Sequence, residues 1–138
     1  MQFSAVIGQA ALKERLIREI NSEKISHAKL FAGKNGHGSL AMALAYSMYL
    51  LCDNKQETDS CGSCHSCKQM SDFVHPDVHF VFPVVLANKV ISNAHLKEWR
   101  EQLEESTYFD LLHWTNIIDT KERKPVIGTE ESIDIHKK

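Results

Sequence analysis

Four cysteines are the most distinctive feature of this 138-residue sequence. They are Cys52, Cys61, Cys64 and Cys67, spaced C-x8-C-x2-C-x2-C. A C-x2-C step lets two thiolates reach one ion from a tight turn, and four thiolates complete a tetrahedral structural zinc site with no open position. We therefore predict a structural Zn²⁺ held by these four cysteines. We expect segment 61–67 to bend, because helical positions i, i+3 and i+6 do not converge with a fourth ligand.

Three other states of the cysteines remain open at this point. Two disulfides would require an oxidising compartment, which nothing else in the sequence indicates. Four free thiols are a further alternative. An iron–sulfur cluster is compatible with the cysteine count but would need redox partners that the sequence does not reveal.

A glycine-rich stretch forms the second group with chemical meaning. Gly33 and Gly38 have the spacing of a phosphate-binding loop, in which Gly, four residues, Gly, Lys and then Ser or Thr stand between a strand and a helix. With Gly36 they would let the backbone wrap a phosphate in front of the free N–H groups of a helix. However, Ser39 occupies the lysine position and Leu40 the hydroxyl position.

This departure from the motif has an energetic consequence. Each charge-assisted hydrogen bond contributes roughly 1.5–3 kcal/mol. Losing both groups should therefore weaken MgATP binding by roughly a hundredfold or more, and hydrolysis more still. We predict a degenerate phosphate loop that does not bind ATP. The alternative is an ordinary glycine-rich turn between a strand and a helix.

The elements that would position these groups alternate between helix and strand. In chain order we expect a helix over 9–23, a buried strand over 27–32, a turn over 33–38, a helix over 39–52, a polar insert, a strand over 78–86, a helix over 92–103, a short helical segment over 108–114 and a helix from Thr129. The helix over 39–52 is apolar nearly all round, so we expect it to lie against a sheet.

This order predicts an α/β domain with a mainly parallel sheet. Two strands alone bury too little to be stable, so a third is expected near 124–127. The last helix ends as its apolar pattern begins, which suggests a piece of a longer protein.

Composition excludes several classes of protein. Hydrophobic residues make up 43% and charged residues 25%, a globular balance. The 16 basic and 18 acidic side chains give a net charge of −2, which disfavours binding to nucleic acid by charge alone. The longest apolar stretch, over 40–52, is too short to cross a bilayer. Residues 1–20 lack the apolar core of a signal peptide, and we expect a cytoplasmic protein.

Several motifs in a fixed order suggest a family. They are Val6-Ile7-Gly8-Gln9, Ser26-His27-Ala28, the loop from Gly33 to Gly38, the cysteine insert and His75-Pro76-Asp77. Together they resemble the N-terminal AAA+ domain of bacterial DNA polymerase III clamp-loader subunits over about residues 1–100. The resemblance implies a three-layer α/β, P-loop NTPase-like (RecA-like) domain, incomplete in these 138 residues. It would carry a zinc-binding insert over 52–70 and a lineage-specific insert over 106–127.

With Ser39 and Leu40 at these positions, the sequence resembles the delta-prime type of that family, whose nucleotide site is inactive. The resemblance then implies a non-catalytic, structural subunit of a hetero-pentamer with other clamp-loader subunits. That complex places the sliding clamp on primed DNA. An acidic Walker B strand and an arginine finger would lie beyond residue 138. The alternatives are an ATP-hydrolysing motor subunit of the gamma/tau type and a zinc-ribbon module that binds nucleic acid.

Overall fold

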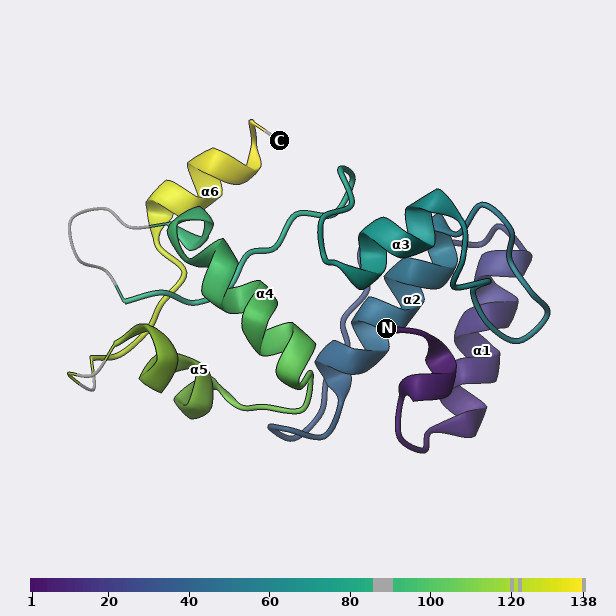
Figure 1. The fold of residues 1–138 in the computed structure, drawn as a ribbon, viewed down its shortest axis with the longest axis horizontal. Coiled ribbons are helices and arrows are strands. Elements are labelled where there is room, and N and C mark those ends of the chain that lie inside the picture. Colours follow the sequence, from purple (N-terminus) through teal and green to yellow (C-terminus); the bar gives the residue numbers. More distant parts are fainter. Residues whose placement is uncertain (86–90, 120, 122, 138) are drawn as a thin grey trace. The chain divides into compact units, whose positions relative to one another are not determined.

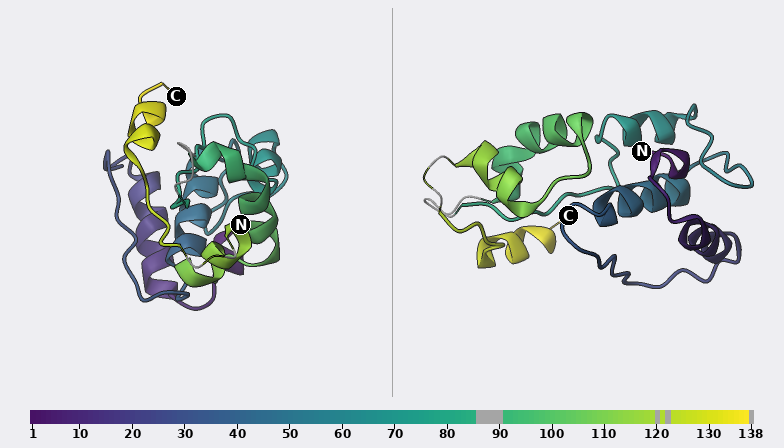
Figure 2. Two further views of the ribbon diagram at one scale, coloured as in Figure 1. Left: turned by 90° about the vertical axis from the view of Figure 1, so that its left-hand side faces the viewer. Right: turned by 90° about the horizontal axis from the view of Figure 1, so that it is seen from below.

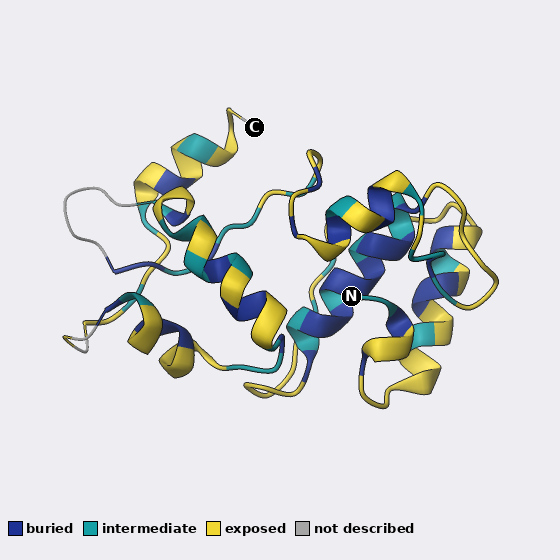
Figure 3. Cartoon of the chain, viewed as in Figure 1, coloured by how far each residue is buried: buried dark blue, intermediate teal, exposed yellow. Residues whose placement is uncertain are grey.

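The computed structural model describes residues 1–85, 91–119, 121 and 123–137. The chain divides into two compact units, an N-terminal unit (Met1–His75) and a C-terminal unit (Pro76–Lys138). Each unit has buried side chains of its own, shown in dark blue in Figure 3.

Among the residues that the structure describes, the regular elements of both units are helices (Figures 1 and 2). The N-terminal unit contains the 3-10 helix η1 (Phe3–Ala5), α1 (Ala10–Asn21), α2 (Ser39–Leu51) and α3 (His65–Ser71). The C-terminal unit contains the 3-10 helix η2 (Ser92–His95), α4 (Leu96–Glu105), α5 (Leu111–Ile118) and α6 (Thr129–Ile135). None of these helices is both long and apolar enough to span a bilayer.

Helix α2 forms the centre of the N-terminal unit. Its side chains are buried on most sides, and it contacts η1, α1 and α3. Tyr49 shows how these contacts combine: its ring lies 5.9 Å from that of Phe3, and its hydroxyl donates to Asn21 Oδ1 at 3.0 Å. The expectation that this helix lies against a sheet is wrong for the described residues. Burial of apolar side chains is favourable whichever element covers them, and here the covering elements are helices.

The expected parallel sheet does not form among the described residues. Residues 27–32 have no regular secondary structure, and Leu30 is 88% exposed, so the prediction of a buried strand is wrong. In the second expected strand, Val84 forms one antiparallel bridge with Val126, with N–O distances of 3.0 and 2.9 Å. Residue 86, the end of that prediction, lies outside the described residues. A strand needs a neighbour to pair its backbone groups, and the two predicted strands fall into different units.

Helices predicted from apolar spacing are confirmed more closely. Leu16 and Ile20 in α1 are buried, and Trp99 and Leu103 in α4 are buried. Helix α6 begins at Thr129, as predicted. Amphipathic spacing works here because each helix buries one face against its own unit.

An aromatic cluster fills the core of the C-terminal unit. Trp99 stacks on Phe82 with ring centroids 4.2 Å apart and meets Trp114 edge to face at 4.8 Å. The ring of Phe109 also meets Trp99 in an edge-to-face arrangement, with ring centroids 5.5 Å apart. The indole N–H of Trp114 donates to the Pro83 carbonyl at 2.8 Å, so the ring is fixed as well as buried. Such aromatic contacts stabilise a core beyond the area they bury.

A buried carboxylate joins α6 to η2 within the C-terminal unit. Glu131 is 2% exposed, and one of its oxygens accepts the backbone N–H of Ser92 at 2.6 Å. The other oxygen accepts the Ser92 hydroxyl. Both carboxylate oxygens therefore have donors, as a buried charged group requires.

Candidate functional site

The four cysteines come from three different local structures of the N-terminal unit. Cys52 follows the last residue of α2, Cys64 caps the N-terminus of α3, and Cys67 lies in the first turn of α3. Cys61 lies in the connecting loop, where Gly62 has a φ of +69°. This left-handed conformation, which suits glycine, turns the chain sharply between Cys61 and Cys64. The predicted bend of segment 61–67 is confirmed up to the start of α3.

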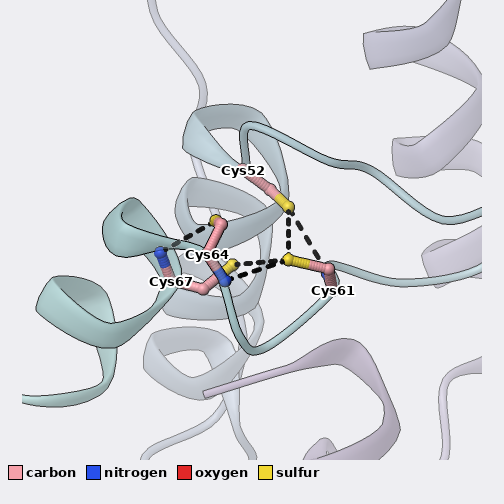
Figure 4. A group of neighbouring side chains, drawn as sticks. All are labelled: Cys52, Cys61, Cys64 and Cys67. Atoms are coloured by element: carbon pink, nitrogen blue, oxygen red, sulfur yellow. Dashed lines mark hydrogen bonds between the residues drawn. The ribbon is translucent and has the colours of Figure 1, made fainter.

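The sulfur atoms converge on one point (Figure 4). All four lie within 4.8 Å of one another, with 3.6 Å between Cys52 and Cys61 and 3.9 Å between Cys61 and Cys67. A tetrahedral zinc with bonds of about 2.3 Å would place its sulfur ligands about 3.8 Å apart. A disulfide would require about 2.0 Å, and all four thiols are free. The donor set and its spacing therefore fit a four-coordinate thiolate metal site.

Backbone N–H groups point at these sulfurs along the loop. Cys61 N–H donates to Cys52 Sγ at 3.3 Å, Cys64 N–H to Cys61 Sγ at 3.3 Å, and Cys67 N–H to Cys64 Sγ at 3.4 Å. Each such bond favours a thiolate over a thiol. Bonds from the Ser63 and Cys64 backbone lower the pKa of Cys61 to about 6.

The innermost sulfur is in a different electrostatic position. Burial, followed by hydrogen bonds with Cys64 and Cys52, raises the pKa of the Cys67 thiol. Four thiolates at these distances would repel one another. A bound cation would offset this repulsion and would favour the deprotonated form of all four cysteines. Cys52 and Cys67 are buried while Cys61 and Cys64 are half-buried, so the cluster is only partly accessible to solvent.

The N-terminus of the chain is bound to the same loop. The Asp59 carboxylate accepts the backbone N–H groups of Phe3 and Ser4 at 3.0 and 2.8 Å. The side-chain amide of Gln2 donates to the Ser60 carbonyl at 2.7 Å. Sequence reasoning missed this contact between residues more than fifty positions apart, because an aspartate in a polar insert carries no signal of its distant partner.

The glycine loop lies at the opposite end of α2 from the cysteines. Gly36 and Gly38 have φ values of +72° and +87°, and Gly38 is the residue that caps α2. Gly33 has no such conformation, so the left-handed backbone is confined to the second half of the loop. Ser39 and Leu40 are the first two residues of α2.

A cavity of about 440 Å³ lies beside this loop. Gly33, Gly38 and Ser39 line it, whereas Gly36 and Leu40 are not among its lining residues. Arg15 and Lys29 bring positive charge to its wall. The Lys29 ammonium contacts both oxygens of Glu19 at 2.6 Å, which lowers the pKa of that carboxyl. One of the two cations is thus already paired with an anion.

Comparison with known proteins now identifies the family. A family model described as DNA polymerase III, delta subunit, matches residues 8–123. The chain belongs to this DNA polymerase III delta subunit family. The match includes both the glycine loop and the cysteine cluster.

Individual relatives agree with this family. DNA polymerase III subunit delta' of Bacillus subtilis is 33% identical over 100 residues, which are 71% of this chain and 29% of the relative. DNA polymerase III subunit delta' of Escherichia coli is 34% identical over 92 residues, 67% of this chain and 27% of the relative. DNA polymerase III subunit gamma/tau of Mycoplasma genitalium is 23% identical over 135 residues, 91% of this chain and 23% of the relative. The chain spans less than a third of each of these proteins, and no solved structure matches it significantly.

In this DNA polymerase III family member, the structure brings the predicted cysteines together but gathers only some of the predicted loop residues at the cavity. The four cysteines predicted as a set are brought together. Two of the three predicted loop glycines, Gly33 and Gly38, border a cavity together with Ser39. Asp59 was missed, as was the hydrogen-bonded pair of Ser66 and His75 beside the cysteines. In the sequence, His75 is distinctive only as part of the motif His75-Pro76-Asp77.

Proposed function

We propose that this chain is the N-terminal part of an AAA+-type, delta-prime-type subunit of the DNA polymerase III clamp loader, acting in the cytoplasm. The subunit would contribute structure to a hetero-pentamer and would not hydrolyse ATP. The family match and the names of the relatives support the membership. The sliding clamp and primed DNA would be reached through the other subunits.

One observation supports the proposal that the subunit does not hydrolyse ATP. The glycine loop leads into α2 through Ser39 and Leu40, at the two positions where an active phosphate loop has a lysine and a magnesium ligand. Lys29, a cation in the cavity wall, is bound to Glu19. The backbone shape of a cradle and the groups that hold a triphosphate come from different residues, and the sequence lacks the motif lysine and the magnesium ligand among those groups.

Calorimetry with millimolar MgATP tests this proposal on the chain as it stands. We expect no binding by the natural sequence. Ser39→Lys combined with Leu40→Thr should raise the affinity by roughly a hundredfold, because two charge-assisted interactions are restored. Micromolar binding by the natural sequence would show that another cation, such as Arg15 or Lys34, takes the role of the lysine. The inactive-subunit proposal would then be withdrawn in favour of a motor subunit of the gamma/tau type.

We also propose that the cysteine cluster binds one structural Zn²⁺. The sulfur distances, the N–H groups directed at the sulfurs and the lack of disulfides among the four cysteines support this assignment. Such a site stabilises folding and leaves no position for a substrate. Elemental analysis of the purified, reduced chain should give one zinc per molecule, and replacement of Cys61 by serine should abolish stoichiometric binding.

A further inference from the structure

Ser66 connects the two elements that carry the buried cysteines. Its hydroxyl donates to the Leu51 carbonyl at 2.7 Å. Leu51 directly precedes Cys52 at the end of α2, and Ser66 directly precedes Cys67 in α3. One side chain therefore links the backbone next to one buried cysteine to the backbone next to the other.

His75 fixes the Ser66 hydroxyl from its other side. The imidazole Nε2 lies 3.0 Å from Ser66 Oγ. A carbonyl can only accept, so the single hydroxyl proton of Ser66 is used on Leu51. The hydroxyl oxygen must then accept from His75, which places a hydrogen on Nε2. Ser66 and His75 are 6% and 9% exposed, so water competes little for either bond.

The Leu51 carbonyl is a group that needs such a partner. The last four carbonyls of a helix have no N–H donor within that helix. Leaving one unpaired away from water costs free energy and frees the end of α2 to shift. Cys52 continues directly from this helix end, so a shift of Leu51 would move Cys52 Sγ relative to Cys67 Sγ.

We propose that Ser66 and His75 are positioning residues for the metal site. They act through backbone placement, since Ser66 bonds the Leu51 carbonyl, His75 bonds the Ser66 hydroxyl, and the four sulfurs already complete the ligand set. A zinc–thiolate site accepts only small deviations in ligand distance, about 0.2 Å. The pair holds the α2 terminus and the first turn of α3 at the separation that four sulfurs require. This inference rests on the proposed zinc site.

Zinc affinity, measured by competition with a chromophoric chelator, tests the role of Ser66. Ser66→Ala should lower the affinity about tenfold, the lower end of the range for residues that orient metal ligands. Ser71→Ala, at the exposed last residue of the same helix, is the control, since it makes the same side-chain change away from the Leu51 carbonyl. We expect no change for Ser71→Ala. An unchanged affinity for Ser66→Ala would overturn the proposal.

Two replacements of His75 test the donor that holds the hydroxyl. Gln places an amide N–H close to the position of Nε2, whereas Leu removes the donor. His75→Leu should lower zinc affinity severalfold, and His75→Gln should retain most of it. Because His75 acts through Ser66, the double variant Ser66→Ala with His75→Leu should bind zinc as well as Ser66→Ala alone. Fully additive losses, or equal losses for Gln and Leu, would contradict this linkage.

The site and its positioning residues can fail separately. Absence of zinc binding by the natural sequence would overturn the metal site itself. Natural affinity in Ser66→Ala, with the visible bands of tetrahedral Co²⁺–thiolate intact, would leave the site standing and remove Ser66 from it. The spectrum of the Co²⁺-loaded variants provides the last distinction. A positioning role changes the arrangement of the sulfurs and shifts the Co²⁺–thiolate bands of Ser66→Ala, whereas a purely structural role lowers the affinity and leaves the bands unchanged.

Discussion

The two units of this chain build their cores from different materials. The core of the N-terminal unit is built around α2, and four cysteine sulfurs cluster near the C-terminal end of this helix. Two of these cysteines are buried. The C-terminal unit surrounds Trp99 with other aromatic rings. Units of this size have little apolar surface to bury and commonly need additional stabilisation. Ring packing is always present once the chain folds, whereas a thiolate cluster stabilises its unit only when a cation is bound.

This difference gives the two units separate reporters. Both tryptophans, Trp99 and Trp114, lie in the C-terminal unit. Tryptophan fluorescence therefore reports on that unit, while the cysteine loop can be followed through its backbone amides.

Chelation should have the largest effect and should act on one unit only. Structural zinc contributes roughly 10–16 kcal/mol apparent in small peptides, so its removal should unfold the cysteine loop and α3. Hydrogen exchange of residues 53–71 should accelerate, while tryptophan emission stays unchanged. Chelator saturated with zinc beforehand is the control. Loss of both signals together would show that the units do not respond separately.

Removing the central ring should have the next largest effect, on the other unit. Trp99→Ala should cost about 3–5 kcal/mol in the free energy of unfolding of the C-terminal unit. Urea unfolding followed by the fluorescence of Trp114 measures this cost. Trp99→Phe is the matched control and should cost less, because it retains a ring and removes an indole N–H that has no hydrogen-bond partner among the described residues. A change in zinc affinity with either variant would contradict the separation of the two units.

The contrast also explains how much the sequence reveals. Cysteine spacing is local, so Cys61, Cys64 and Cys67 could be assigned to one site from the sequence. Amphipathic helices such as α1 and α4 are also encoded locally, in apolar residues three and four positions apart.

Features that depend on distant partners could not be predicted. The segment 27–32 has the composition of a buried strand, yet Leu30 is exposed, because strand pairing depends on a neighbour that composition does not specify. The Asp59 contact with Phe3 and the Ser66 contact with His75 are likewise set by how the chain folds back. A single polar residue in the sequence gives no indication of such a partner.

A smaller effect should follow from releasing the N-terminus from the cysteine loop. Asp59→Ala removes an acceptor from the N–H groups of Phe3, Ser4 and Ser60. By analogy with the loss of a helix N-cap, the cost should be about 0.5–2 kcal/mol. Thermal unfolding of the zinc-loaded chain measures this cost. Hydrogen exchange at residues 3–6 reports whether the N-terminus is released. Asp53→Ala, an exposed aspartate of the same insert, should change neither. Equal effects of the two variants would show that the carboxylate contact does not hold the N-terminus.

The smallest effect at neutral pH, and the clearest pH dependence, should come from Asp119 in the C-terminal unit. The Arg123 guanidinium bonds both Asp119 oxygens at 3.0 and 3.1 Å, which lowers the pKa of that carboxyl to about 2 from its ordinary value of 3.8. A depressed folded-state pKa means that the ionised carboxylate stabilises the folded unit fully above about pH 4. That contribution is lost as the pH falls towards 2. Half of the Arg123 side chain is exposed, so salt should weaken the pair.

Asp119→Asn should therefore lower the free energy of unfolding of the C-terminal unit at pH 6, measured by urea and tryptophan fluorescence. The difference from the natural sequence should shrink between pH 4 and pH 2, because protonation then removes the same charge in both proteins. Glu104→Gln, on the exposed side of α4, controls for the loss of one negative charge. A difference that stays constant down to pH 2 would mean that the introduced amide disturbs the packing and that the ion pair is not the cause. At pH 6, zinc affinity should be the same for Asp119→Asn and the natural sequence, since Asp119 and the cysteines belong to different units.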